Sequence, residues 1–167
     1  SEKVIMEGLN KPLLKWWIQF ACTVFAAIIA YEIGWLSALY NADITKISIV
    51  ILILFALTTG LIGYMSKYHY IETYRKLGNY AWFSSEAMIT LGMIGTVAGF
   101  LLMLSSAFTE LDVKSVTSVQ GAISDMALGM STALSTTLVG LICSVFTKVQ
   151  MVILENCWDK DVDEIEI

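Results

Sequence analysis

The stretch AMITLGMIGTVAGFLLMLSSAFT, residues 87–109, contains no charged side chain. A helix that crosses the hydrocarbon core of a bilayer needs about 20 mostly apolar residues, so this stretch predicts a transmembrane helix. Two further stretches, at 47–66 and 126–147, are equally free of charge, and a fourth, at 16–39, contains only Glu32. The sequence therefore predicts an all-α integral membrane protein with four transmembrane helices.

The composition of the chain supports this class. Of its 167 residues, 57% are hydrophobic and 15% are charged, whereas roughly 25% are charged in an ordinary soluble domain. The net charge of −5 arises from residues 155–167, because the other acids and bases cancel. Nucleic-acid binding is excluded, since recognition of phosphates needs clustered positive charge. We expect a membrane domain over 1–154 and an acidic cytoplasmic tail over 155–167.

Basic residues set the expected orientation, because loops rich in Lys and Arg stay in the cytoplasm. Eight of the ten Lys and Arg residues fall in the N-terminal segment, the middle connection (67–86) and the C-terminal side. The first and third connections contain only Lys46 and Lys114. The sequence therefore predicts a multi-pass protein of the bacterial inner (cytoplasmic) membrane, in contact with membrane lipid and with both termini cytoplasmic.

Both ends of the chain extend this arrangement. Residues 1–10 predict a short amphipathic helix along the membrane surface, ended by Pro12 before the first span. No break signal follows the fourth span, so we expect extended cytoplasmic helix ends. The acidic tail forms either a solvated, partly disordered terminus or, multiplied by oligomerisation, a ring that docks a basic partner or concentrates cations.

The sequence offers no constellation for catalysis or metal binding. Its single histidine, His69, falls in the predicted middle connection, and Cys22, Cys143 and Cys157 lack the paired spacing of a zinc site. The glycines of the third span lie inside a helix rather than in a phosphate-binding loop. We predict no enzyme, no metal and no cofactor.

The third and fourth spans differ from the second, whose Ile, Leu and Val predict a lipid-facing helix. Each carries small and hydroxylated residues three and four apart, which places them on one helix face. Thr96 and Thr137 lie near the middle of their spans, about 14–17 Å deep at ~1.5 Å per residue. Such stripes either let helices pack closely or line a hydrated ion path. The stripes are Gly92, Thr96, Gly99, Met103 and Ser106 in the third span, and Gly129, Ala133, Thr136, Thr137, Gly140, Ser144 and Thr147 in the fourth.

Two strings in these spans resemble the signature helices of the MotA/TolQ/ExbB proton-channel family. LGMIGTVAGF (91–100) is similar to the family's LGLLGTVxG pattern, and GMSTALSTTLVGL (129–141) is similar to its GxxxALxxTxxGL pattern. The resemblance implies a homo-oligomer, a pentamer around a dimer of a single-span partner. The partner's aspartate carries the ion and faces two threonines, at the positions of Thr96 and Thr137.

The implied function is that of a channel-forming subunit in a membrane motor complex of the stator type. An H⁺ or Na⁺ gradient drives such a complex, and ion flow is coupled to mechanical work. The candidate ion-pathway residues are Thr96, Thr137, Thr136, Ser135 and Thr132. The candidate helix-packing residues are Gly92, Gly95, Gly99, Gly129, Ala133 and Gly140.

Departures from the family pattern and two alternatives accompany this interpretation. ExbB- and TolQ-like members carry a glutamate where Thr132 stands, and flagellar members have a large insertion where this chain has only 67–86. Apart from Glu32 the spans contain no titratable group, and a proton relay usually needs one, so a partner must supply it. The alternatives are a non-conducting membrane scaffold packed through small-residue faces, and a stand-alone transporter centred on Glu32.

Overall fold

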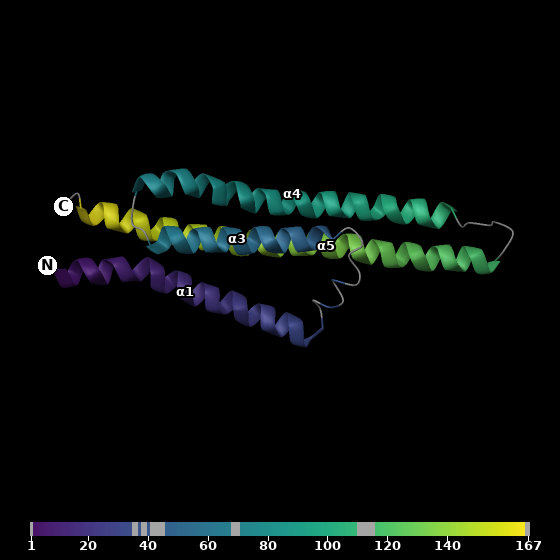
Figure 1. Cartoon of the computed structure of the whole chain (residues 1–167), viewed down its shortest axis with the longest axis horizontal. Helices are drawn as coiled ribbons and strands as arrows, with labels where there is room; N and C mark the ends of the chain where they lie inside the picture. Colours follow the sequence, from purple (N-terminus) through teal and green to yellow (C-terminus); the bar gives the residue numbers. More distant parts are fainter. Residues whose placement is uncertain are drawn as a thin grey trace.

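The computed structural model of the chain describes residues 2–34, 37, 40, 46–67, 71–109 and 116–165. Its helices in these ranges are α1 (Glu2–Glu32), α3 (Ile47–Lys67), α4 (Ile71–Thr109) and α5 (Val116–Ile165). Each of the four is long and apolar enough to cross a membrane, which confirms the predicted class and the number of spans. The helices alternate in direction, so α1 begins and α5 ends at one end of the molecule, here called the terminal end (Figure 1).

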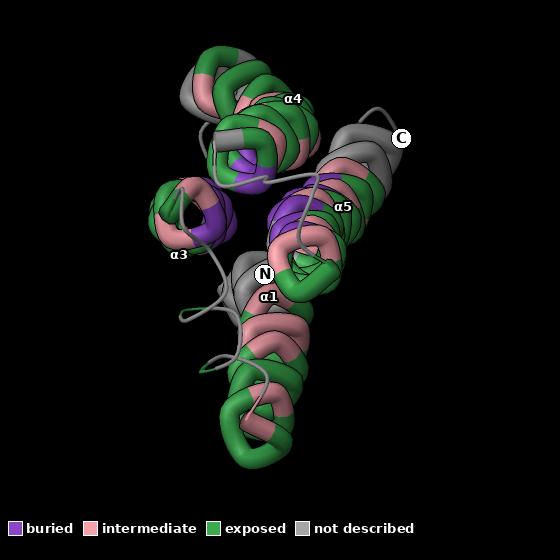
Figure 2. The backbone as a smooth tube through the Cα atoms, turned by 90° about the vertical axis from the view of Figure 1, so that its right-hand side faces the viewer, coloured by how far each residue is buried: buried purple, intermediate pink, exposed green. Residues whose placement is uncertain are grey.

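Three of the helices, α3, α4 and α5, form a bundle, and their buried faces turn toward one another (Figure 2). The contact between α4 and α5 is the most extensive, and α1 packs on α3 and α5. From the terminal end onward, α1 diverges from the bundle (Figure 1). No residue of its apolar segment, Leu14–Glu32, is buried, so α1 is a peripheral helix.

The buried face of α3 is partly polar. Its buried residues fall three, four or seven positions apart, with two adjacent pairs, which places them on one helix face. Two hydroxyls on this face donate to carbonyl oxygens of their own helix, Thr58 to Leu54 (2.7 Å) and Ser66 to Ile62 (3.0 Å), which satisfies them inside an apolar bundle. The expectation of a simply lipid-facing helix is therefore wrong for this face. The buried residues are Ser48, Ile51, Thr58, Thr59, Ile62, Met65 and Ser66.

The helices α4 and α5 approach closely because glycines leave out side chains where the backbones meet. A Cβ atom added at Gly140 would lie 2.5 Å from the carbonyl oxygen of Met88. A Cβ atom added at Gly92 would lie 3.2 Å from the Cα atom of Thr137. Small residues at such positions allow the dispersion contacts that hold membrane helices together.

Both α4 and α5 extend well beyond their charge-free segments. The 50 residues of α5 cover about 75 Å at ~1.5 Å per residue, against a hydrocarbon core of about 30 Å. The predicted middle connection, 67–86, is helical from Ile71 onward. Outside the charge-free segments, the Trp82 indole N–H of α4 donates to Glu155 Oε1 of α5 at 2.9 Å. Extended helix ends are thus confirmed, and α5 continues into the acidic tail as far as Ile165.

The N-terminal part of the chain departs from expectation at two points. The helix α1 continues through Pro12, although a break was predicted there. A proline removes one i→i−4 hydrogen bond, and α1 remains helical on both sides of it. At the other end α1 stops at Glu32 rather than 39, because Gly34 adopts a left-handed conformation (φ 78°); its N–H donates to the carbonyl oxygen of Tyr31 at 2.9 Å. His69 lies outside the described residues, as does the side chain of Cys157.

We predict that Gly140→Ala destabilises the bundle whereas Gly60→Ala does not. The added methyl at Gly140 meets the Met88 carbonyl, which belongs to a helix backbone and cannot move aside cheaply. Overpacking of this kind costs about 1–3 kcal/mol. Apart from the neighbouring backbone of its own helix, no described atom lies within 4 Å of a Cβ added at Gly60. Thermal unfolding of the purified variants measures the difference, and equal midpoints for the two would contradict the packing described.

Candidate ion pathway

The hydroxyl groups of Thr96 on α4 and Thr137 on α5 are in direct contact. Two backbone carbonyls lie beside them. Thr96 Oγ1 is 3.0 Å from the Gly92 oxygen and 3.2 Å from the Ala133 oxygen, and Thr137 Oγ1 is 3.1 Å from the Gly92 oxygen. Four oxygen atoms from two helices therefore converge near the centre of the apolar segments.

This arrangement leaves capacity to accept hydrogen bonds. A hydroxyl group has one donor hydrogen and two acceptor lone pairs. The two threonine hydroxyls donate their hydrogens to the carbonyl oxygens of Gly92 and Ala133 or to each other, so lone pairs on the hydroxyl oxygens remain free to accept. The site therefore suits a partner group that donates a hydrogen bond, or a hard cation that takes oxygen ligands.

The glycine stripe determines that the two hydroxyls meet. Gly92 lies one turn before Thr96, and Gly140 lies one turn after Thr137, so close backbone contact flanks the pair. Next along α4, a Cβ added at Gly99 would lie 3.5 Å from the Cβ of Ala133. The packing residues and the threonine pair are therefore parts of one helix contact.

An open apolar hollow of about 300 Å³ adjoins Thr96. Its walls belong to α4 and α5 alone, and several of them are largely exposed: Val97 (60%), Leu101 (60%) and Leu134 (63%). Apolar side chains exposed on a membrane-spanning helix face either lipid or another helix. The hollow is lined by Thr96, Val97, Phe100, Leu101, Met130, Ala133 and Leu134.

Two other predicted pathway residues, Thr136 and Ser135, make contacts outside this oxygen cluster. Thr136 is 1% exposed, and its hydroxyl is 3.4 Å from that of Ser48 on α3, so it belongs to the interior of the three-helix bundle. The Ser135 hydroxyl donates to the carbonyl oxygen of Ser131 in its own helix, at 2.8 Å. The side chain of Thr132 lies outside those that the structure describes.

Of the predicted packing residues, Gly95 and Gly129 face side chains rather than backbone. An added Cβ at Gly95 would overlap the Thr136 Cγ2 atom, and one at Gly129 would lie 2.6 Å from the Met103 Cβ atom. Both atoms are close to the backbone of α5 or α4 and Thr136 is stiff because it is β-branched, so these two positions are also tight parts of the α4–α5 contact.

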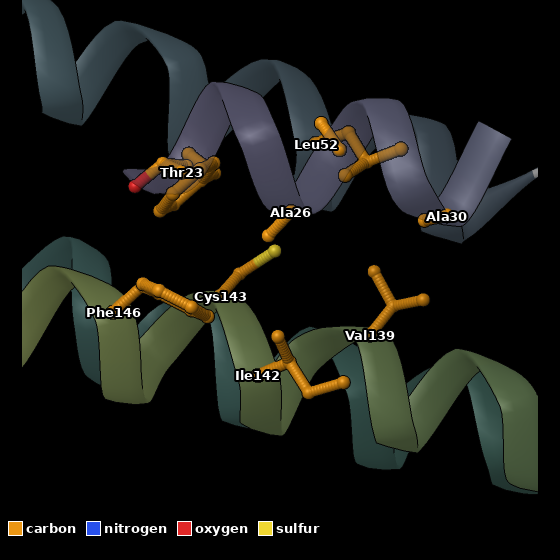
Figure 3. Close-up of a pocket in the computed structure, with 10 residues that line it drawn as sticks. Thr23, Ala26, Ala30, Leu52, Val139, Ile142, Cys143 and Phe146 are labelled. Atoms are coloured by element: carbon orange, nitrogen blue, oxygen red, sulfur yellow. The ribbon is translucent and has the colours of Figure 1, made fainter. Parts of the chain in front are cut away.

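A second hollow, of about 150 Å³, separates α1 from α3 and α5. The Cys143 sulfur points across it toward Ala26 (Figure 3). Thr23 lines the hollow too, but its hydroxyl donates to the Gln19 carbonyl of its own helix at 2.9 Å. The rest of the lining is aliphatic or aromatic, so this hollow suits lipid rather than an ion.

Charged groups stay at the ends of the apolar segments. The stretches 16–31, 47–66, 87–109 and 126–147 contain no Asp, Glu, Lys or Arg. Glu32 ends α1 and is exposed, away from the threonine pair. Among the described residues, no group of three or more His, Cys, Asp or Glu side chains is placed to hold a metal ion.

Sequence reasoning missed the polar contribution of α3. Ser48 reaches the Thr136 hydroxyl, and the buried hydroxyls of α3 (Ser48, Thr58, Thr59 and Ser66) lie on the face of α3 that packs into the bundle. These residues were present in the sequence, but the many Ile and Leu residues of α3 obscured them.

These features define a class: a multi-pass membrane protein whose two longest helices bring uncharged oxygen ligands together at mid-span. The sequence model of the MotA/TolQ/ExbB proton channel family matches residues 70–167, which is more than half of the chain and includes α4, α5 and the threonine pair. The chain belongs to this family, as its motifs indicated. No curated protein and no solved structure matches it. Membership makes it a proton-channel subunit of a family that functions in oligomeric complexes with partner proteins, and a channel component rather than a member of an enzyme family.

We predict that Thr136→Val lowers stability more than Thr90→Val. Thr136 is buried beside Ser48, and losing the hydrogen bond between the two hydroxyls costs about 0.5–1.5 kcal/mol. Thr90 is exposed, and its hydroxyl donates only to the Glu86 carbonyl of its own helix in the described structure. A melting point about 2–4 °C lower per kcal/mol is expected for a chain of this size. Equal melting points for the two variants would place Thr136 outside the bundle interior.

Proposed function

We propose that this chain is the channel-forming subunit of an ion-driven membrane motor, and that Thr96 and Thr137 accept the ion-carrying group of a partner. The contact between the two threonine hydroxyls carries this proposal. In it, subunits form a pentamer around a dimer of a single-span partner whose aspartate lies beside the pair. Ion binding to that aspartate and its release drive rotation of the pentamer relative to the partner dimer. The gradient of H⁺ or Na⁺ across the membrane supplies the energy.

The chemistry of the site supports a borrowed aspartate. A carboxylic acid donates a hydrogen bond when protonated and only accepts when ionised. Acceptor oxygens at Thr96 and Thr137 therefore favour the protonated form, and loss of the proton weakens the contact. The charge-free segments around the pair contain no Asp, Glu, His, Lys or Arg that could take this role.

Exposed apolar surface supports an oligomer around a central helix. The hollow beside Thr96 is open, and the exposed residues around it occupy both α4 and α5. A partner helix against this face and neighbouring subunits on its flanks would cover the apolar surface.

The proposal also includes orientation and place. The terminal end faces the cytoplasm of a bacterium, the membrane is the inner one, and residues 1–154 form the membrane domain with 155–167 as an acidic cytoplasmic tail. The excess of Lys and Arg near the terminal end supports this. We propose Thr136 as a structural residue of the subunit, because it is buried beside α3, and Ser135 and Thr132 as secondary positions along the path.

We predict that Thr96→Val and Thr137→Val each reduce ion flux while the complex still assembles. Valine keeps the shape of threonine but cannot accept a hydrogen bond. Losing one hydrogen bond to a charged or titrating group costs about 1.5–3 kcal/mol, which slows passage about ten- to a hundredfold. Proton uptake into vesicles that contain the chain and its partner measures the effect.

Thr90→Val is the matched control, because Thr90 lies on the same helix but is exposed and bonded to its own backbone. Full flux in both Thr96→Val and Thr137→Val, with normal assembly, would reject the channel role of the pair and favour the non-conducting scaffold. Wild-type activity of Glu32→Gln would exclude a transporter centred on Glu32.

A further inference from the structure

A small polar pocket lies where the first turns of the membrane segment of α1 meet α3 and α5. Its volume is about 10 Å³, and it is lined by Trp16, Gln19, Ser66, Gln150, Ile153 and Leu154. It is near the terminal end, well away from the threonine pair, and the proposed ion path does not use it.

The Trp16 ring is held firmly at this pocket. Its ring stacks on that of Phe20, with centroids 5.2 Å apart and planes 18° from parallel. On the other side it lies against Gly63 of α3, where an added Cβ would come within 2.5 Å of the ring. Gly63 thus makes room for the indole, which packs against the apolar cluster at the terminal end of the bundle.

Three buried polar atoms at this pocket have no hydrogen-bond partner within the part of the chain that the structure describes. They are Trp16 Nε1 and both amide atoms of Gln150, Oε1 and Nε2. Gln150 is only 3% exposed, so bulk water does not solvate its amide. Buried polar groups are almost always paired with protein or with ordered water, and three unpaired atoms around one small pocket point to a bound ligand.

The atoms present specify the ligand. The indole N–H is a donor only, whereas the glutamine amide offers an acceptor oxygen and two N–H donors. A ligand between them must both accept and donate a hydrogen bond. A pocket of about 10 Å³ is large enough for one water-sized molecule only. A water molecule meets both requirements, since a buried water needs about that volume and two to four polar partners.

We propose that one structural water molecule binds in this pocket and bridges α1 to α5. It accepts a hydrogen bond from Trp16 Nε1 and donates one to Gln150 Oε1. The Ser66 hydroxyl, which donates to the Ile62 carbonyl at 3.0 Å, keeps lone pairs for a further contact. The water links the peripheral helix to the bundle at the end where α1 lies closest to it.

The test is a density map of the assembled complex in lipid nanodiscs at a resolution that reveals ordered waters. We expect one density peak within about 3.2 Å of both Trp16 Nε1 and the Gln150 amide. An empty pocket would overturn the proposal, as would a Gln150 side chain bonded directly to the indole or a lipid headgroup in the pocket. The wild-type map decides the question even where a variant fails to fold.

Gln150→Met and Gln120→Met form a matched pair for a second test. Both replace a glutamine of α5 by an apolar residue of similar length, but Gln120 is exposed. We expect the density peak to disappear only in Gln150→Met, with a melting point lower by about 2–4 °C, because the indole N–H then loses its partner. An unchanged melting point together with an unchanged peak in Gln150→Met would show that the amide does not hold the water.

Discussion

The close contact between α4 and α5 is the constraint on which the rest of the molecule depends. At Gly140 and Gly92 the two backbones approach so closely that a single methyl group would meet a carbonyl oxygen or a Cα atom. Hydrophobic driving force between helices is weak in lipid, so stability there comes from dispersion contacts and hydrogen bonds at short range. The same short range brings Thr96 and Thr137 together. Packing and chemistry at mid-span are therefore consequences of one interface.

Hydroxyl groups in the bundle are hydrogen-bonded in two different ways, either to their own helix or also to a neighbouring helix. Three buried hydroxyls on α3 and α5, those of Thr58, Ser66 and Thr147, donate to carbonyl oxygens of their own helix, so they add little to contacts between helices. At the threonine pair, by contrast, the hydroxyls also reach across to the neighbouring helix. That difference separates a side chain that is only tolerated in the apolar interior from one that presents oxygen atoms to an incoming group.

The number of spans, the class and the family could be predicted from the sequence, because charge-free length and the spacing of small residues depend on local chain properties. The sequence could not predict that Thr137 meets Thr96 whereas Thr136, the residue before it, turns toward Ser48 of α3. Adjacent residues on a helix point about 100° apart, and which of them turns toward α3 is decided by the position of a third helix. Sequence patterns also misjudged Pro12, because they weigh a single residue's preference and not the length of helix on each side of it.

The pocket at Trp16 and Gln150 was equally beyond prediction. Each residue is ordinary on its own, a tryptophan near a span boundary and a glutamine one turn after a span. Their common feature, three polar atoms around one small space, exists only after α1 and α5 have docked. Partner-dependent features, such as the role of the exposed α4–α5 face, similarly depend on surfaces outside the single chain.

Because α5 is long and uninterrupted, a small tilt near its middle moves its far end by a larger distance. After Gly140, the helix contains neither Gly nor Pro as far as Ile165, so no residue of the kind that commonly kinks a helix interrupts it. From Thr137 to Ile165 it covers about 42 Å at ~1.5 Å per residue. If α5 tilts by about 10° at the threonine pair, simple geometry moves its far end by about 7 Å. A small tilt at mid-span would thus become a displacement of several ångströms at the acidic tail.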